Sequence, residues 1–266
     1  MSKAKALVIR TAGTNCDVET AHAFRLAGAF ADVMHINSLI KNKSAMKKFN
    51  ILAIPGGFSY GDDIASGKIL ANEMKHSLKN ELSEFVSRGK LVIGICNGFQ
   101  VLVKMGLLPL FTKDELFAPK VTLTLNDAGH YIDRWIYLKK DPVKNLCVWT
   151  KQLPEIIYLP IAHAEGKFVP QSSEVLKKLR ANGQIVFRYS DEAGNEGAYP
   201  VNPNGSVDNI AGICDSTGRI LGMMPHPERH IFFTQHPRWQ RCVKKGKETG
   251  IGLQIFRNAV QFVNKA

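Results

Sequence analysis

The segment Gly94-Ile-Cys-Asn-Gly98 combines residue types and a spacing that suit nucleophilic catalysis. An apolar run leads directly into it and a helical pattern follows, so we expect Cys96 at a strained strand-to-helix turn between two glycines. The partial positive charge of a helix N-terminus favours the thiolate form of such a cysteine. The backbone N–H of Asn97 would then be placed to stabilise an oxyanion. The alternative is an inert cysteine buried at the end of a strand.

A second segment, Pro225-His-Pro-Glu228, could supply the base for that nucleophile. Its two prolines exclude a helix interior and predict an extended backbone, in which residues two apart point to the same side. Glu228 would therefore orient the imidazole of His226 or stabilise its charged form, as in a Cys-His-acid triad. The alternative is a proline-rich surface loop.

A glycine-rich segment, Pro55-Gly-Gly-Phe-Ser-Tyr-Gly-Asp62, follows another apolar run. It should lie at the same carboxyl edge of the sheet as Cys96, where ligands bind in such sheets. The segment has neither the phosphate-loop pattern nor the dinucleotide fingerprint, and a plain turn is the alternative. His163 and Glu165 could belong to a site or to a turn. No spacing of histidines or cysteines is typical of a metal site, so we expect no metal.

These segments need a sheet that brings them to one edge. Apolar runs at residues 6–9, 31–36, 51–54 and 91–95 predict buried strands, and helices are expected between them. One helix would be capped by Asp17 and end near Gly28, and another would carry the apolar positions Met74, Leu78, Leu82, Phe85 and Val86. This alternation predicts an α/β fold, with a parallel-centred sheet and helices on both of its faces.

The second half of the chain has a different pattern. Short strand candidates separated by turn residues predict an antiparallel extension of the sheet, and a final amphipathic helix is expected at residues 253–263. We predict one domain over residues 1–266, with a core at about 5–230 and a basic segment and terminal helix at 231–266. The strand candidates are residues 121–125, 131–138, 156–161, 184–189, 210–214 and 219–224.

The composition limits where this chemistry takes place. Five cysteines without a C-x-x-C pair argue against a disulfide framework and suit a reducing cytoplasm. We expect no secretory signal and no membrane-spanning segment, since the apolar runs are short. The formal net charge is +12, but the lysines are dispersed and lack a nucleic-acid motif. Solvated faces or an acidic protein partner therefore account for the charge better than nucleic acid does.

Taken together, these motifs resemble the class I (triad) glutamine amidotransferases. The similarity is closest to the glutaminase part of phosphoribosylformylglycinamidine synthases of purine biosynthesis, and it covers about residues 5–230. It departs from that family at Ala164, where glycine is expected, and at residues 67–70. The segments that carry the resemblance are Gly13-Thr-Asn-Cys-Asp17, Pro55-Gly-Gly-Phe-Ser-Tyr-Gly-Asp-Asp63, Gly94-Ile-Cys-Asn-Gly-Phe-Gln100, Tyr199-Pro-Val-Asn-Pro-Asn-Gly-Ser206 and Met223-Met-Pro-His-Pro-Glu-Arg229.

The resemblance implies a role for each matching residue. Cys96 would attack the side-chain amide of glutamine, and His226 would move protons with the support of Glu228. The backbone N–H groups of Gly57 and Asn97 would form the oxyanion hole, and Gln100 would help to hold the substrate.

The resemblance also implies a partner. Ammonia would pass to a synthetase subunit that converts formylglycinamide ribonucleotide to the amidine. ATP and magnesium would bind that subunit, with no cofactor in this chain, and a small accessory subunit is a further expected partner. Two other functions stay open on the sequence alone: a cysteine peptidase or deglycase with the same turn, and a non-catalytic regulatory subunit.

Overall fold

The computed structural model describes residues 3–141, 146–241 and 248–265. Its main feature is a nine-stranded mixed sheet in the order β2-β1-β3-β4-β11-β10-β9-β6-β7. The first five strands in this order are parallel. Their residues are mostly buried, as expected for strands that are covered on both faces. They are β2 (Phe30–His35), β1 (Lys5–Arg10), β3 (Ile51–Ile54), β4 (Leu91–Ile95) and β11 (Ile220–Met223).

Antiparallel strands extend this block, as predicted for residues 131–138, 156–161, 184–189 and 210–214, but residues 219–224, also expected in the extension, form β11 of the parallel block instead. The extension consists of β10 (Ile210–Cys214), β9 (Ile185–Ser190), β6 (Ile132–Lys140) and β7 (Ile156–His163). Two further strands, β5 (Val121–Thr124) and β8 (Lys167–Pro170), pair in a separate ribbon. Neither β8 nor the helix α6 (Ser173–Ala181) that follows it was predicted.

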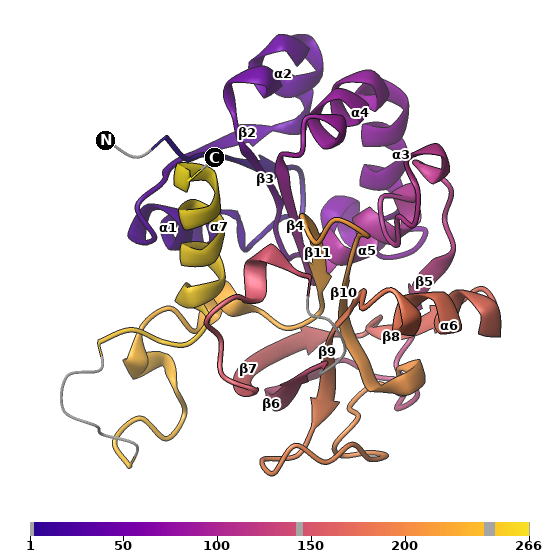
Figure 1. Cartoon of the computed structure of the whole chain (residues 1–266), viewed down its shortest axis with the longest axis vertical. Helices are drawn as coiled ribbons and strands as arrows, with labels where there is room; N and C mark the ends of the chain where they lie inside the picture. The colour runs from indigo at the N-terminus through magenta and orange to yellow at the C-terminus, as the bar shows by residue number, and fades with distance from the viewer. Residues whose placement is uncertain (1–2, 142–145, 242–247, 266) are drawn as a thin grey trace.

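Helices cover both faces of the parallel block (Figure 1). α1 (Asp17–Leu26) and α7 (Leu253–Lys265) lie on one side, while α3 (Lys68–Ser77), α4 (Lys79–Ser87) and α5 (Asn97–Met105) lie on the other. The short helix α2 (Ile36–Lys41) follows β2. The α/β class and the helices on both faces are therefore confirmed.

The terminal helix α7 packs onto α1 and joins the common core. The rings of Phe24 and Phe256 meet edge to face, with centroids 4.9 Å apart. Cys242 and residues 244–247, which were included in the expected basic segment, lie outside the described residues. Within the described ranges, no helix is long and apolar enough to cross a membrane.

Two local predictions about helices were wrong. The apolar positions from Met74 to Val86 do not form one helix, because Leu78 has φ −124° and separates α3 from α4. Asp17 does not cap α1; it is the first helical residue, and Cys16 takes the N-cap position. Periodicity detected the buried face in the first case, but it could not detect a one-residue break.

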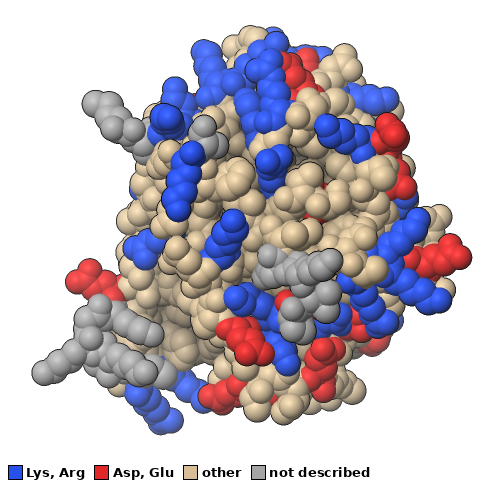
Figure 2. All heavy atoms as spheres, in the orientation of Figure 1, with Lys and Arg blue, Asp and Glu red and all other residues tan. Residues whose placement is uncertain are grey.

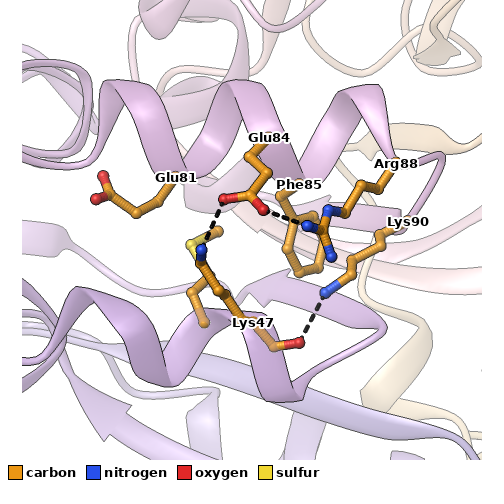
Figure 3. Close-up of a pocket in the computed structure, with 7 residues that line it drawn as sticks. Lys47, Glu81, Glu84, Phe85, Arg88 and Lys90 are labelled. Atoms are coloured by element: carbon orange, nitrogen blue, oxygen red, sulfur yellow. Dashed lines mark hydrogen bonds and ion pairs between the residues drawn. The ribbon is translucent and has the colours of Figure 1, made fainter.

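Charged residues are scattered over the face seen in Figure 2. One cluster has a clear structural role: Glu84 of α4 pairs with Lys47 at 3.4 Å and with Arg88 at 2.6 Å. Lys90 donates to the carbonyl of Lys47 at 3.0 Å. Figure 3 shows these contacts around a pocket of about 10 Å³, which has room for about one water molecule. The cluster therefore fixes α4 to the turn at Lys43–Lys48.

Candidate active site

Cys96 lies at the turn between β4 and α5, with φ 50° and ψ −105°. A positive φ is uncommon for a residue with a side chain and marks local strain. The Cys96 N–H donates to the carbonyl of Met223 at 2.8 Å, which ties the turn to β11. A Cβ added at Gly98 would lie 1.8 Å from the carbonyl oxygen of Ile54, so only glycine lets α5 lie this close to β3. The strand-turn-helix geometry predicted around Cys96 is present.

His226 and Glu228 follow β11, the neighbour of β4, and both are buried. Nδ1 of His226 lies 2.6 Å from Oε1 of Glu228. The predicted contact is therefore present, but the predicted backbone was only partly right. His226 is extended, whereas Pro227–Arg229 form a 3-10 turn that begins with the proline. Proline fits the first position of a helical turn because the N–H that it lacks would have no partner there.

The geometry defines how the imidazole of His226 can act. Its Nδ1 faces the carboxylate, so this nitrogen carries the proton, and Nε2 is buried without a hydrogen-bond partner among the described residues. Burial by itself lowers the pKa of His226, but the negative charge of Glu228 and that of a Cys96 thiolate outweigh burial and raise the pKa well above its ordinary value. The site therefore favours an imidazolium next to the sulfur of Cys96.

A second cysteine lies against the same imidazole. The sulfur of Cys16 is 3.9 Å from Nδ1 of His226 and accepts a hydrogen bond from Arg229 at 3.1 Å. Burial raises the pKa of the Cys16 thiol, although His226 and Arg229 oppose this effect. Sequence reasoning did not assign Cys16 to the site. The available signal was its position just after β1, at the same carboxyl edge of the sheet as Cys96.

Cys16, His226 and Glu228 also offer ligand atoms within 4.8 Å of one another. Sulfur, nitrogen and oxygen donors of this kind are those that zinc takes. In this structure the atoms contact each other instead, and the guanidinium of Arg229 contacts the sulfur. A positive charge at that distance opposes a cation.

Two residues were expected to form the oxyanion hole: Gly57, in the loop after β3, and Asn97, which directly follows Cys96. Gly57 has φ 141°, a conformation open to glycine. Phe58 donates to the carbonyl of Gly13 at 2.9 Å, and Cys16 donates to the carbonyl of Gly56 at 3.2 Å, so neither bond uses the Gly57 N–H. Asn97 is the first residue of α5, and its N–H therefore has no hydrogen-bond acceptor within the helix.

The side chain of Gln100, which was expected to help hold the substrate, forms a buried brace with that of Asn97. Asn97 accepts from the Ser59 N–H at 3.3 Å, and it donates to Asp62 at 3.1 Å and to Gln100 at 3.0 Å. Gln100 in turn donates to the backbone carbonyl of Glu165 at 2.5 Å. The side-chain oxygen and nitrogen of Gln100 thus both have hydrogen-bond partners within the protein. A substrate role for Gln100 stays a prediction.

The segment from His163 to Glu165 belongs to the site region. Ala162, the last but one residue of β7, accepts a hydrogen bond from the sulfur of Cys96 at 3.6 Å. The carboxylate of Glu165 accepts from the Ser66 N–H at 3.3 Å and lies 3.9 Å from the ammonium of Lys104. Glu165 therefore connects the loop after Pro55 to α5.

Comparisons with known proteins identify the family of the chain. Residues 3–263 match the family model for the CobB/CobQ-like glutamine amidotransferase domain. The chain is 47% identical over 266 residues to the phosphoribosylformylglycinamidine synthase subunit PurQ of Dehalococcoides mccartyi, covering 100% of both chains. It is 44% identical over 272 residues to PurQ of Methanococcus maripaludis, covering 98% of each.

The chain belongs to the PurQ family of glutamine amidotransferases. A chain in the structure of PurLQS from Thermotoga maritima has the same fold, with a TM-score of 0.73 and 28% identity, and the match covers 98% of this chain and 99% of that one. The fold also resembles a glutamine amidotransferase of Thermotoga maritima at a TM-score of 0.55 and 13% identity.

Proposed function

We propose that this chain hydrolyses glutamine and delivers the ammonia to a synthetase subunit, which converts formylglycinamide ribonucleotide to formylglycinamidine ribonucleotide in purine biosynthesis. One observation carries the chemical part of the proposal. A strained cysteine at a helix N-terminus lies close enough to a buried His-Glu pair for its thiolate to raise the pKa of the histidine, whose Nε2 has no other hydrogen-bond partner among the described residues.

In the proposed first step, the sulfur of Cys96 attacks the side-chain carbonyl carbon of glutamine, and a C–S bond forms as the carbonyl electrons move to oxygen. The imidazolium of His226 then gives its Nε2 proton to the amide nitrogen. The C–N bond breaks, ammonia leaves, and a glutamyl thioester remains. In the second step, Nε2 takes a proton from water, and the resulting hydroxide cleaves the C–S bond to give glutamate and the free cysteine.

Two backbone groups would stabilise the negative oxygen in both steps. They are the N–H groups of Gly57, in the loop after β3, and of Asn97, the first residue of α5. Removing one such donor costs roughly a hundredfold or more in rate. Glu228 would keep His226 in the required tautomer, and Gln100 would act on substrate through the brace that it forms with Asn97.

The rest of the proposal concerns the assembly. The chain works as one domain over residues 1–266 and needs no cofactor of its own. ATP and magnesium bind the partner synthetase, and a small accessory subunit completes the complex. The PurQ relatives and the PurLQS assembly support such a partnership. Purine biosynthesis of this kind places the complex in the cytoplasm.

Labelling with a glutamine-like diazo-ketone, followed by mass spectrometry, tests the nucleophile. The chain is treated alone and together with the synthetase, its ribonucleotide and ATP. Labelling of Cys96 that glutamine blocks is the expected result. Cys96→Ala should abolish glutamine-dependent synthesis while ammonia still supports it. Equal loss of both activities would show that Cys96 is structural, and labelling of Cys16 in its place would reassign the nucleophile.

A further inference from the structure

His163 is a buried histidine that the triad does not use. It ends β7 and is only 2% exposed, next to Ala162, whose carbonyl contacts the Cys96 sulfur. Three residues before it, Pro160 accepts the His226 N–H at 2.9 Å. β7 therefore contacts both catalytic candidates, Cys96 and His226, and His163 is the residue at which β7 ends.

The contacts of Asn126 determine which ring nitrogen of His163 carries the proton. The Asn126 amide group donates to the carbonyls of His130 and His163, at 3.1 Å and 2.9 Å, so its nitrogen and oxygen positions are defined. Its oxygen accepts from the Gly166 N–H at 3.0 Å and lies 3.1 Å from Nδ1 of His163. An amide oxygen can only accept, so Nδ1 must donate.

The other ring nitrogen, Nε2, is therefore an acceptor. It is buried and has no hydrogen-bond partner among the described residues. Burial, and then the positive charge of His226, lower the pKa of His163 to about 3, so the ring stays neutral at neutral pH. An unsatisfied buried acceptor is costly, which favours a donor arriving with a ligand.

We infer that Nε2 of His163 accepts a hydrogen bond from the carboxamide NH2 of bound glutamine and from the ammonia that it becomes. This inference rests on the proposed glutaminase function. Glutamine brings two kinds of N–H donor, its side-chain amide and its α-ammonium. A neutral imidazole suits the neutral amide, whereas a fully charged ammonium in a buried site needs a compensating charge. The same contact would orient the leaving nitrogen toward the proton of His226.

Two substitutions separate this role from a structural one. His163→Asn can keep the donor that replaces Nδ1, and thus the bond to Asn126, but it has no acceptor at the Nε2 position. His163→Gln can place an amide oxygen near that position but loses the Nδ1 contact. We expect His163→Asn to lower the glutaminase kcat/KM roughly tenfold to a hundredfold, and His163→Gln to retain more activity. His76→Asn, exposed on α3, is the control.

A second substrate identifies the donor. A γ-glutamyl methyl ester keeps the α-ammonium but has no amide N–H. The ratio of wild-type to His163→Asn activity should shrink toward one with this ester. A ratio that is unchanged with the ester would assign the contact to the α-ammonium and overturn the inference. Greater activity in His163→Asn than in His163→Gln would overturn it too, because the anchoring bond to Asn126 would then be what matters.

The test also distinguishes the inference from the proposed function. If the diazo-ketone labels Cys96 in wild type and glutamine protects it, the glutaminase proposal stands whatever the His163 variants do. If wild type neither hydrolyses glutamine nor becomes labelled in the presence of the synthetase, the proposed function has failed, and the inference fails with it. Co-purification of each variant with the synthetase reports whether it folds and assembles.

Discussion

A single methyl group at Gly56 would test whether the position of His226 limits the reaction. A Cβ built on Gly56 lies 2.7 Å from Cε1 of His226 and 3.3 Å from the sulfur of Cys16. Carbon atoms in contact are ordinarily about 3.5–4.0 Å apart, so the ring or its loop must move by about 1 Å. The backbone of Gly56 is outside the left-handed region, so alanine adds crowding without backbone strain.

The displacement gives the size of the expected effect. A misplacement of about 1 Å in a catalytic geometry can cost roughly a hundredfold in rate. Extra volume in a packed interior costs about 1–3 kcal/mol of stability, which a domain of this size can tolerate. We therefore expect Gly56→Ala to fold and to lose roughly a hundredfold in glutaminase kcat.

The assay compares glutamine-dependent and ammonia-dependent synthesis in the assembled enzyme. Gly56→Ala should lose the first and keep the second. Gly197→Ala is a matched control, because a Cβ there meets its nearest atom at 3.5 Å, an ordinary contact. Wild-type glutaminase activity in Gly56→Ala, or equal loss of both activities, would refute the view that Gly56 acts by setting the position of His226.

Three further predictions concern the same region. Gly98→Ala should destabilise the fold by at least about 1–3 kcal/mol in denaturant unfolding, because its Cβ would overlap the Ile54 carbonyl; an unchanged midpoint would contradict this packing. His163, whose pKa falls to about 3 on folding, should make the protein lose stability as the pH falls from about 6.5 toward 3. His163→Asn should flatten the stability curve between these pH values. His226, whose pKa is raised, does not contribute to this loss, because its stabilising effect is lost only as the pH rises above about 6.5. A curve that is equally steep in His163→Asn would show that His163 is not the group responsible. Asp62→Ala should raise the KM for glutamine, because Asp62 anchors its loop to the Asn97 amide; a KM unchanged from wild type would show that the anchor does not shape the site.

Sequence motifs determined the chemical elements of the candidate site. A cysteine between glycines after an apolar run can adopt few backbone conformations, and the structure has the expected turn at Cys96. The His226–Glu228 contact was also predictable, because two residues so close in sequence can meet through local geometry alone. The parallel strands β1, β3 and β4 were found from short apolar runs, whereas the parallel position of β11 was not predicted.

Other features depended on the order of strands in the sheet. Cys16 and His226 are 210 residues apart, and they meet because β1 and β11 end at the same edge. The periodicity of apolar residues along the sequence gives no information about a contact between positions so far apart. Gln100 donates to the carbonyl of Glu165 for a similar reason, because β7 brings residue 165 against α5.

The difference between the two groups of features is physical. Apolar period, glycine and proline constrain the backbone within a few residues, so the sequence by itself determined most of the strands, the strained turn and the His-Glu pair. Three features arise from burial and from contacts between distant segments. They are the protonation of His163, its Nε2 without a hydrogen-bond partner among the described residues, and the packing of Gly56 against the imidazole of His226. Only the tertiary structure decided these, because burial and long-range contacts exist only once the sheet is assembled.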